Sequence, residues 1–366
     1  MSEKKKILHL ITGLEIGGAE IMLLKTLPKM QNDFDNCVCT LLKDGPIGEK
    51  LRETGIITYH LDFSLSNSLR SILLFRRIIK DFKPNILVTY LIHSDLFGRI
   101  FGRTFGIQEI ICSQRGSLQK WEFLRFFDRL TKSLVTKYIV QTEIAKKELM
   151  TKLNLPEEEF EVIPNAIDVA EYEFKLDTNA KKKELGINPN NQSIVCVSNL
   201  HKGKGHKYLL EAFEEVYKNN KDVNLLIVGD GEQRTTLEEQ NKNYASRNNT
   251  YFLGKRNDVK EILKISDIFV LATEKEGMSN AIMEAMATGL PIIATNISEN
   301  KELLLSDRTR ILVPPKNVSA LTDTIEELLI NISFRTSLKE NAKKYIKTKY
   351  DVNIVIPKFV QLFKSL

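Results

Sequence analysis

Short apolar runs alternate with amphipathic segments along almost the whole chain. Residues 7–11, 85–90 and 223–228 have the continuous apolar character of buried strands, and segments with helical spacing such as 69–82 lie between such runs. Strands of a parallel sheet are buried on both faces, and each needs a crossover helix to reach the next strand. The alternation therefore predicts an α/β fold built from doubly wound parallel sheets.

The clearest strand-loop-helix-strand unit lies at residues 266–295. An apolar run over 268–272 predicts a strand, a polar loop follows, and an Ala- and Met-rich helix is predicted from about Asn280 to Thr288. Gly289 is suited to the left-handed turn that ends a helix, and the proline two residues later prevents its continuation. In open α/β sheets such a loop lies at the carboxyl end of its strand, where ligands bind.

Two glutamates lie on either side of the start of this predicted helix. Glu276 precedes the helix, and Glu284 follows Asn280 by about one turn, so both can face the space beyond the strand. Ionised carboxylates accept hydrogen bonds from paired sugar hydroxyls, and a helix N-terminus offers free N–H groups to an anion or polyol. The alternative is a solvated loop with two ordinary glutamates.

The stretch from Glu276 to Thr295 resembles the E-x7-E signature of the retaining glycosyltransferases of the GT-4 family. The resemblance implies the GT-B fold, in which two Rossmann-like domains face a cleft. It also implies that Glu284 accepts the ribose hydroxyls of a nucleotide-sugar donor. Glu276, as a catalytic residue, would hold the transferred sugar together with the backbone of Gly277, Met278, Ser279 and Asn280.

Two further loops of the second half resemble GT-4 segments. Residues 198–206 resemble G-R-L-x-x-x-K-G, which places Lys204 at the phosphate-binding and catalytic lysine. Asn199 stands where the family has arginine, so one expected cation is missing, and neither His201 nor Lys202 nearby sits at a matching position. Residues 250–259 resemble FLG-x-R-x-DV. That resemblance implies that Arg256 and Asn257 read the edge of the nucleotide base.

Two sites in the first half complete the resemblance. Gly17 and Gly18, in the sequence GGAE, follow the first strand and open a helix, as does the GT-4 glycine loop that faces the donor diphosphate and the acceptor. The alternative is a plain tight turn. His93 comes just after the predicted strand 85–90, and it resembles a GT-4 histidine near the transferred sugar, which implies a catalytic role. His9 and His60, within and at the end of strands, are interpreted as structural.

The same resemblance sets the domain boundaries. Residues 1–168 form the predicted acceptor-binding domain, which ends in a segment similar to the family's VIPNGVD. Residues 169–190 are charged and irregular and are interpreted as a linker. Residues 191–352 form the predicted nucleotide-sugar domain, and residues 353–366 are predicted to return as a helix onto the first domain.

Composition narrows the class of protein. The chain has 366 residues, enough for two domains, and no apolar run is long enough for a transmembrane helix. The basic N-terminus leads into a short apolar run with no cleavage-site pattern, which predicts a strand instead of a signal peptide. The four cysteines lie in apolar strand contexts without metal-ligand spacing, which indicates reduced core residues of a cytoplasmic protein.

The net charge of +6 is unevenly distributed. Residues 66–152 carry more than twice as many basic as acidic side chains, and 120–130 combine basic residues with aromatic ones. Such a surface suits anionic lipid head groups at the inner face of the cell membrane, so we predict peripheral membrane contact there. The alternatives are a solvated basic face and an ordinary amphipathic helix packed on its own domain. No recognition motif for nucleic acid accompanies the charge.

The sequence therefore predicts a hexosyl- or N-acetylhexosaminyltransferase that moves a sugar from a UDP- or GDP-sugar to a glycan or lipid-linked acceptor in bacterial cell-surface synthesis. No Asp-x-Asp pair accompanies the predicted site, so we expect no metal and no cofactor beyond the donor. Two alternatives stay open. One is another GT-B enzyme, such as an epimerase or a phosphorylase, and the other is a silent nucleotide-sugar-binding subunit.

Overall fold

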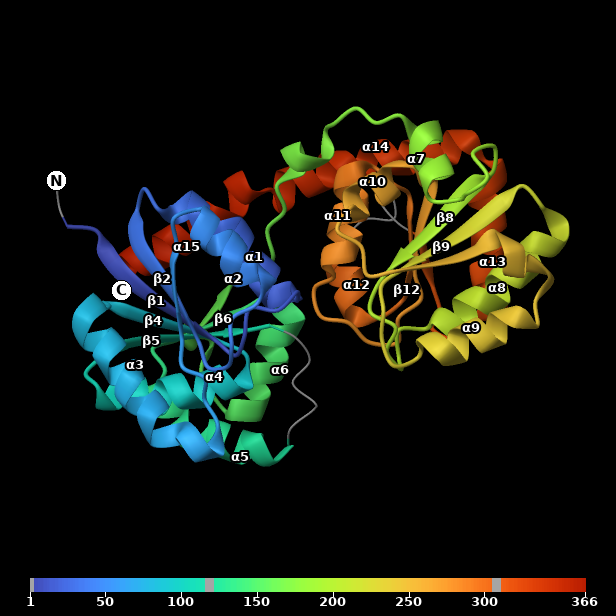
Figure 1. Ribbon diagram of the computed structural model, residues 1–366. Helices are drawn as coiled ribbons and strands as arrows, with labels where there is room; N and C mark the ends of the chain where they lie inside the picture. The colour runs from blue at the N-terminus through green and yellow to red at the C-terminus, as the bar shows by residue number, and fades with distance from the viewer. Residues whose placement is uncertain (1–2, 116–121, 305–310) are drawn as a thin grey trace. The chain divides into compact units, whose positions relative to one another are not determined.

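The structure is a computed structural model that describes residues 3–115, 122–304 and 311–366 (Figure 1). The chain forms two compact units. Unit 1 consists of Met1–Ala166 together with Val352–Leu366, and unit 2 consists of Ile167–Asp351. Each unit contains one parallel sheet covered by helices, which confirms the predicted α/β class.

The sheet of unit 1 has the order β3-β2-β1-β4-β5-β6-β7 among the described residues, and its neighbouring strands are parallel. The chain moves outward from β1 in one direction and from β4 in the other, so the strand order reverses between these two strands. Ligands of open α/β sheets bind at such a reversal, beyond the carboxyl ends of the strands. The strands are β1 (Lys5–Ile11), β2 (Phe34–Thr40), β3 (Ile57–His60), β4 (Ile86–Tyr90), β5 (Glu109–Gln114), β6 (Lys137–Val140) and β7 (Phe160–Val162).

Helices cover both faces of this sheet. One face carries α1 (Gly18–Thr26), α2 (Pro46–Glu53) and α15 (Val352–Ser365). The other face carries α3 (Ser68–Phe82), α4 (Ile92–Phe97) and the π-helical turn η3 (Gly98–Gly102). The described part of unit 1 also contains α5 (Glu122–Thr131), α6 (Glu143–Leu153) and the short turns η1 (Pro28–Met30), η2 (Leu65–Asn67), η4 (Lys132–Leu134) and η5 (Glu157–Glu159).

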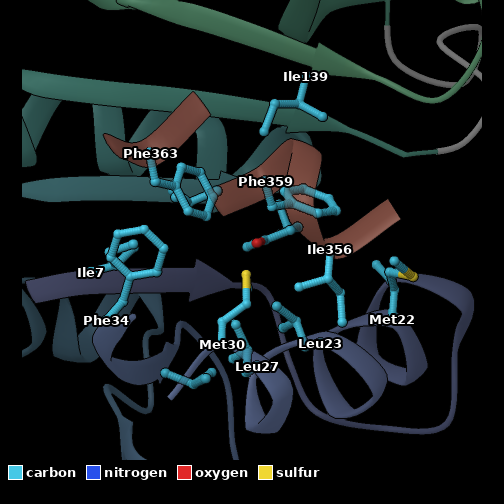
Figure 2. Close-up of a cluster of buried hydrophobic side chains, with 14 of the residues drawn as sticks. Ile7, Met22, Leu23, Leu27, Met30, Phe34, Ile139, Ile356, Phe359 and Phe363 are labelled. Atoms are coloured by element: carbon cyan, nitrogen blue, oxygen red, sulfur yellow. The ribbon is translucent and has the colours of Figure 1, made fainter. Parts of the chain in front are cut away.

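The C-terminal helix α15 belongs to the core of unit 1. Ile356, Phe359 and Phe363 are buried against α1 and β1, and the Phe363 ring meets Phe34 edge to face with centroids 5.7 Å apart (Figure 2). Fully burying such side chains stabilises a fold by roughly 1.5–3 kcal/mol each. The last residues of the chain therefore complete the core that its first residues begin.

The sheet of unit 2 has the order β10-β9-β8-β11-β12-β13 among the described residues, and it is also parallel. Its strand order reverses between β8 and β11. The strands are β8 (Gln192–Val197), β9 (Val223–Val228), β10 (Thr250–Gly254), β11 (Ile268–Leu271), β12 (Ile292–Thr295) and β13 (Ile311–Val313).

Two buried clusters separate the faces of the second sheet. One cluster packs η6 (Val169–Tyr172), α10 (Val259–Lys264), α11 (Asn280–Thr288), α12 (Ser298–Leu303) and α14 (Ile332–Lys349) against the sheet. The other packs α8 (His206–Asn219), α9 (Arg234–Lys242) and α13 (Val318–Ile330). The described residues of unit 2 also form α7 (Thr178–Glu184) and η7 (Ala245–Asn249).

The predicted linker 169–190 is not irregular. It contains η6 and α7, and it is part of unit 2. Val169, Tyr172 and Ile187 are buried in the core of that unit, which fixes a stretch that its charge alone had suggested was solvated.

Two local expectations also differ from the structure. The sequence pattern predicts a helix over residues 96–105 after β4. The helix α4 begins earlier, at Ile92, so His93 lies in its first turn. In α5 the inward side chain is Asp128, whereas Phe126 and Leu130 of that helix are about 60% exposed. Trp121, which was expected in the apolar stripe, lies outside the described residues. The helical spacing predicts a stripe of Trp121, Leu124 and Leu130 with either Phe127 or Asp128. The structure has Asp128 at the inward position, because it pairs with the buried Arg99, whereas Leu130 is exposed.

Candidate functional site

The centre of the candidate site lies where the strand order of unit 2 reverses. Lys204 follows β8 and Glu276 follows β11, and these strands are adjacent. The Lys204 Nζ and the Glu276 Oε2 form an ion pair of 2.6 Å, with the two side chains 24% and 16% exposed. The fold therefore brings together two predicted catalytic residues that are 72 positions apart in the sequence.

Glycine makes the contact between these two loops possible. Gly205 has a φ of +73°, and a Cβ there would lie 1.9 Å from the Ala272 carbonyl oxygen at the end of β11. The neighbouring Gly203, with a φ of +91°, accepts a hydrogen bond of 2.8 Å from the backbone of Glu274. Any side chain at 205 would separate the loops, so this spacing of glycines around Lys204 holds the lysine near Glu276.

The loop that carries Glu276 leads directly into the N-terminus of α11. Ser279 is its N-cap and accepts a hydrogen bond from the Ile282 backbone N–H at 3.3 Å. Met278 is buried in the core of unit 2, and this anchors the loop segment from Gly277 to Asn280 ahead of the helix. The predicted bounds of α11 are confirmed, and Gly289 ends the helix in the left-handed conformation.

Glu284 lies one turn into α11 and contacts a residue that the sequence argument missed. Its carboxylate accepts a hydrogen bond from the hydroxyl of Tyr172, whose ring is 1% exposed. Burial, and then the nearby Glu284 carboxylate, raise the pKa of Tyr172 well above its ordinary value, so the phenol stays protonated and donates. The sequence offered little reason to place Tyr172 in the site, because this residue lies in the stretch interpreted as a linker.

Arg256 is engaged with a carboxylate of its own loop. Its Nε and one Nη donate to the two carboxylate oxygens of Asp258, at 2.7 and 2.6 Å. Lys181 reaches Asp258 at 2.7 Å and Glu261 at 2.7 Å. Arg256, followed by Lys181, holds the pKa of Asp258 well below its usual range. The side chain of Arg256 is therefore fixed beside the loop that carries Asn257, next to the end of β10.

Ser198 stands where the family pattern has glycine, and its side chain contacts His206. The Ser198 hydroxyl and the His206 Nε2 are 2.9 Å apart, and burial, with the Lys204 charge, lowers the pKa of His206 to about 4. His206 is thus neutral at physiological pH. Asn199, at the position of the family's arginine, is exposed.

The predicted site residues of unit 1 lie at the reversal point of the other sheet. Gly17 is the N-cap of α1 with an extended backbone, and a Cβ there would lie 2.3 Å from the Glu20 carboxylate. Gly18 is the first residue of the helix and is exposed. The backbone at 17 is extended and open to any residue, and a side chain there would displace only the flexible carboxylate of Glu20.

His93 is exposed in the first turn of α4, after β4, which is paired with β1. Its neighbour Ser94 is joined to Thr12 by a hydrogen bond of 3.1 Å between their hydroxyls, which connects the loops after β4 and β1. Leu91, just before α4, has a φ of +71°, a strained conformation for a side chain of this size. His9 and Tyr90, by contrast, form a buried structural pair with a hydrogen bond of 3.0 Å.

Among the described residues, no cluster of three or more His, Cys, Asp or Glu side chains is arranged to hold a metal ion. None of the helices in the described ranges has the length and apolar character needed to cross a membrane.

The two halves of the chain match two family models. Residues 16–171 match the model described as "Glycosyltransferase Family 4", and residues 177–345 match the model described as "Glycosyl transferases group 1". A relative from Escherichia coli, the UDP-Gal:alpha-D-GlcNAc-diphosphoundecaprenol alpha-1,3-galactosyltransferase, is 27% identical over 98% of this chain and 97% of its own length. The N-acetyl-alpha-D-glucosaminyl L-malate synthase of Bacillus anthracis is 28% identical over 57% of this chain and 54% of its own length.

Solved structures agree on the fold. The crystal structure of Anabaena HepE in complex with UDP-glucose superposes with a TM-score of 0.87 at 20% identity, covering 99% of this chain and 100% of that one. The two family models together match nearly all of residues 16–345. The structural likeness extends over 99% of the chain. The chain belongs to the glycosyltransferases that combine a family 4 domain with a group 1 domain in the GT-B fold.

Proposed function

We propose that this glycosyltransferase moves a sugar from a UDP-sugar, with retention of anomeric configuration, to a diphosphate-linked lipid acceptor in bacterial cell-surface synthesis. The observation that carries the proposal is the Lys204–Glu276 pair at the N-terminus of α11, with Glu284 one turn behind it. This group supplies a cation, two carboxylates and free N–H groups within one loop region. Relatives that act on UDP-Gal or hold UDP-glucose support the choice of uridine.

In the proposed chemistry, different residues bind the ribose, the diphosphate and the sugar of the donor. Glu284, held by the Tyr172 hydroxyl, accepts the ribose hydroxyls. Lys204 leaves Glu276 for the diphosphate, and Glu276 then accepts hydroxyls of the transferred sugar. As the sugar–phosphate bond breaks, Lys204 and the N–H groups at the start of α11 stabilise the charge that develops on the leaving diphosphate. In unit 1, Gly17, Gly18 and His93 are proposed as substrate-binding residues.

We also propose that transfer needs no metal ion. Lysine and a helix N-terminus can together stabilise the diphosphate charge that a divalent ion neutralises in other enzymes. The leaving phosphate assists attack of the acceptor hydroxyl from the same face. This route accounts for retention without a carboxylate nucleophile.

A peripheral position at the membrane suits a lipid-linked acceptor. In unit 1, Leu69 and Leu73 of α3 are 77% and 63% exposed, and the same helix carries Arg70, Arg76 and Arg77. Exposed leucines with arginines on one helix favour contact with anionic lipid. Flotation with phosphatidylglycerol vesicles, lost in a Leu69→Asp, Leu73→Asp variant, is the expected result.

The first experiment is a thermal-shift panel of UDP- and GDP-sugars in EDTA, on the wild type and Glu284→Ala. A donor that binds the folded state raises the melting temperature by mass action. We expect a UDP-sugar to raise it, EDTA to have no effect, and Glu284→Ala to abolish the shift. Glu239→Ala, an exposed carboxylate of the same unit, is the matched control and should keep the shift.

Release of UDP on addition of an acceptor separates an enzyme from a silent binding subunit. The silent-subunit reading stays relevant because Asn199 replaces the family's arginine. A UDP-sugar shift without UDP release from any diphosphate-linked sugar would favour that reading. The anomeric configuration of the product, read by NMR coupling constants, tests retention.

A further inference from the structure

A second arginine-centred cluster lies in unit 1, outside the groups assigned above. Arg115 follows β5, Gln141 follows β6 and Asn165 lies just beyond β7. The pairings Gln114↔Val140 and Val140↔Val162 put these strand ends in one row. Since the strands are parallel, the three side chains project from the same carboxyl edge of the sheet, the edge at which α/β folds bind ligands.

Hydrogen bonds hold this row together. The Asn165 Oδ1 accepts one bond from an Arg115 Nη and another from the Gln141 Nε2, both 2.5 Å long. The Arg115 Nε donates to the Ser113 hydroxyl at 3.1 Å. Asn165 is 3% exposed and Ser113 is 1% exposed, so the guanidinium is held from two sides by buried partners.

All the partners of this arginine are neutral. Among the described residues no carboxylate lies within ion-pair distance of Arg115, and its second Nη has no acceptor. The side chain is half-buried. Burial lowers the pKa of the Arg115 guanidinium, and among the described residues the hydroxyl of Tyr90 is the titratable group that acts to raise it. A desolvated cation without an anion is unfavourable in a folded protein.

Arg99, an arginine that is fully buried in unit 1, provides a comparison with Arg115. Arg99 is fully buried and forms an ion pair with Asp128, and its charge also interacts with Asp95. Its guanidinium lies over the Tyr138 ring at 5.5 Å from the centroid. The part of the fold that the structure describes thus supplies carboxylates to the arginine in its core and none to the arginine at the ligand-binding edge.

We propose that Arg115, oriented by Asn165 and Ser113, binds an oxyanion of the acceptor, either a phosphate of a diphosphate linkage or a carboxylate. Arginine is suited to this because its fork donates two parallel hydrogen bonds to either group. The anion supplies the missing charge partner, and the free Nη supplies one of the bonds. This inference rests on the proposed function, because it takes the ligand of unit 1 to be the acceptor.

The test uses inorganic pyrophosphate and malonate as probes in calorimetric titrations of the full chain. Lys204→Ala is the background, because it removes the proposed diphosphate cation of unit 2. We expect Arg115→Gln in this background to weaken pyrophosphate binding at least tenfold and Arg115→Lys to weaken it less. Arg52→Gln, at an exposed arginine of the same unit, removes the same charge and should change nothing.

The two probes distinguish the two sources of the oxyanion. Dependence on Arg115 for pyrophosphate indicates a diphosphate acceptor, and dependence for malonate alone indicates a carboxylate acceptor. Equal affinities for both probes with and without Arg115 would overturn the proposal. This failure differs from failure of the proposed function, which would leave the wild type without a UDP-sugar shift.

Thermal unfolding separates ligand binding from a structural role. An uncompensated cation held for binding should leave the melting temperature unchanged or raised when Arg115 becomes Gln, since glutamine keeps an amide donor for Asn165. A fall of several degrees that Arg115→Lys restores, with pyrophosphate affinity unchanged, would show that the residue only supports the loop and would overturn the inference.

Discussion

The cationic side chains at the carboxyl edges of the two sheets have different kinds of partner. In unit 2 two predicted site cations at this edge have carboxylate partners: Lys204 pairs with Glu276, and Arg256 pairs with Asp258. In unit 1 the edge carries Arg115 with neutral partners only among the described residues. In unit 2, a bound nucleotide-sugar donor can separate the paired lysine and glutamate and form its own hydrogen bonds with each of them. The arrangement in unit 1 leaves a cation whose partner must come from outside the described fold.

The largest effect is expected from breaking the compensated arginine of unit 1. Asp128→Ala leaves Arg99 buried without its ion-pair partner, and such a loss lowers the free energy of unfolding by about 3–5 kcal/mol. Urea unfolding followed by circular dichroism measures it. Asp81→Ala, at an exposed i,i+4 pair on α3, is the control and should stay within about 0.5 kcal/mol. A loss below about 1 kcal/mol for Asp128→Ala would remove the contrast with Arg115.

Acid should affect the two units unequally. His206 in unit 2 and His9 in unit 1 are buried, and burial lowers the pKa of each to about 4. Each bound proton then favours the unfolded chain, so stability is complete above the ordinary pKa of 6.5 and falls by about 3 kcal/mol per histidine as pH drops to 4. In unit 1 burial raises the pKa of Asp95 to about 6.

Asp95 offsets His9 because its shift has the opposite sign. Between pH 6 and 3.8 the folded state holds the proton on Asp95 while the unfolded chain loses it, so unit 1 gains stability as pH falls. Hydrogen exchange in β8–β9 should therefore accelerate more than in β1–β2 when pH falls from 6.5 to 4.5, after correction for intrinsic rates. His206→Gln should flatten the response of unit 2 alone. Equal slopes in both units would contradict this assignment.

A smaller effect, on the affinity for a UDP-sugar, is expected from removing the charge of Lys204 in unit 2. Lys204→Met removes the charge proposed to meet the donor diphosphate and should weaken UDP-sugar affinity about 100-fold, or roughly 2.7 kcal/mol. Lys202→Met, an exposed lysine of the same loop, is the matched control. If Lys202→Met produced the larger loss in calorimetric titrations, Lys202 and not Lys204 would be the phosphate ligand.

The smallest effect concerns the hydrogen bond behind Glu284. Tyr172→Phe removes the hydroxyl and leaves the ring in the core, so UDP-sugar affinity should fall about fivefold, equivalent to about 1 kcal/mol. Tyr345→Phe is a useful comparison, because it also removes a phenol hydroxyl from the core of unit 2, one that lies beside Tyr350. Pyrophosphate affinity in the Lys204→Ala background should be the same in both variants. An unchanged UDP-sugar affinity for Tyr172→Phe would show that Glu284 is positioned by α11 alone.

Local patterns in the sequence determined most of the elements. The bounds of α11 and α6 follow from caps and periodicity, since a serine or threonine N-cap and a left-handed C-terminal residue are local signals. The buried strands follow from continuous apolar runs. The separation of Glu276 and Glu284 around a helix start also needed no tertiary information. These features depend on residues within a few positions of one another, which is why sequence reasoning reaches them.

Tertiary structure alone decided which charges meet. Lys204 reaches Glu276 because β8 and β11 are neighbours in the sheet, and Tyr172 reaches Glu284 because the stretch interpreted as a linker packs into the core. The sequence shows the basic character of residues 66–152, but it does not show that Arg99 pairs with a carboxylate whereas Arg115 has only neutral partners among the described residues. Pairing of a charge depends on groups far away in the chain, and burial sets its energy. Both quantities exist only once the chain has folded.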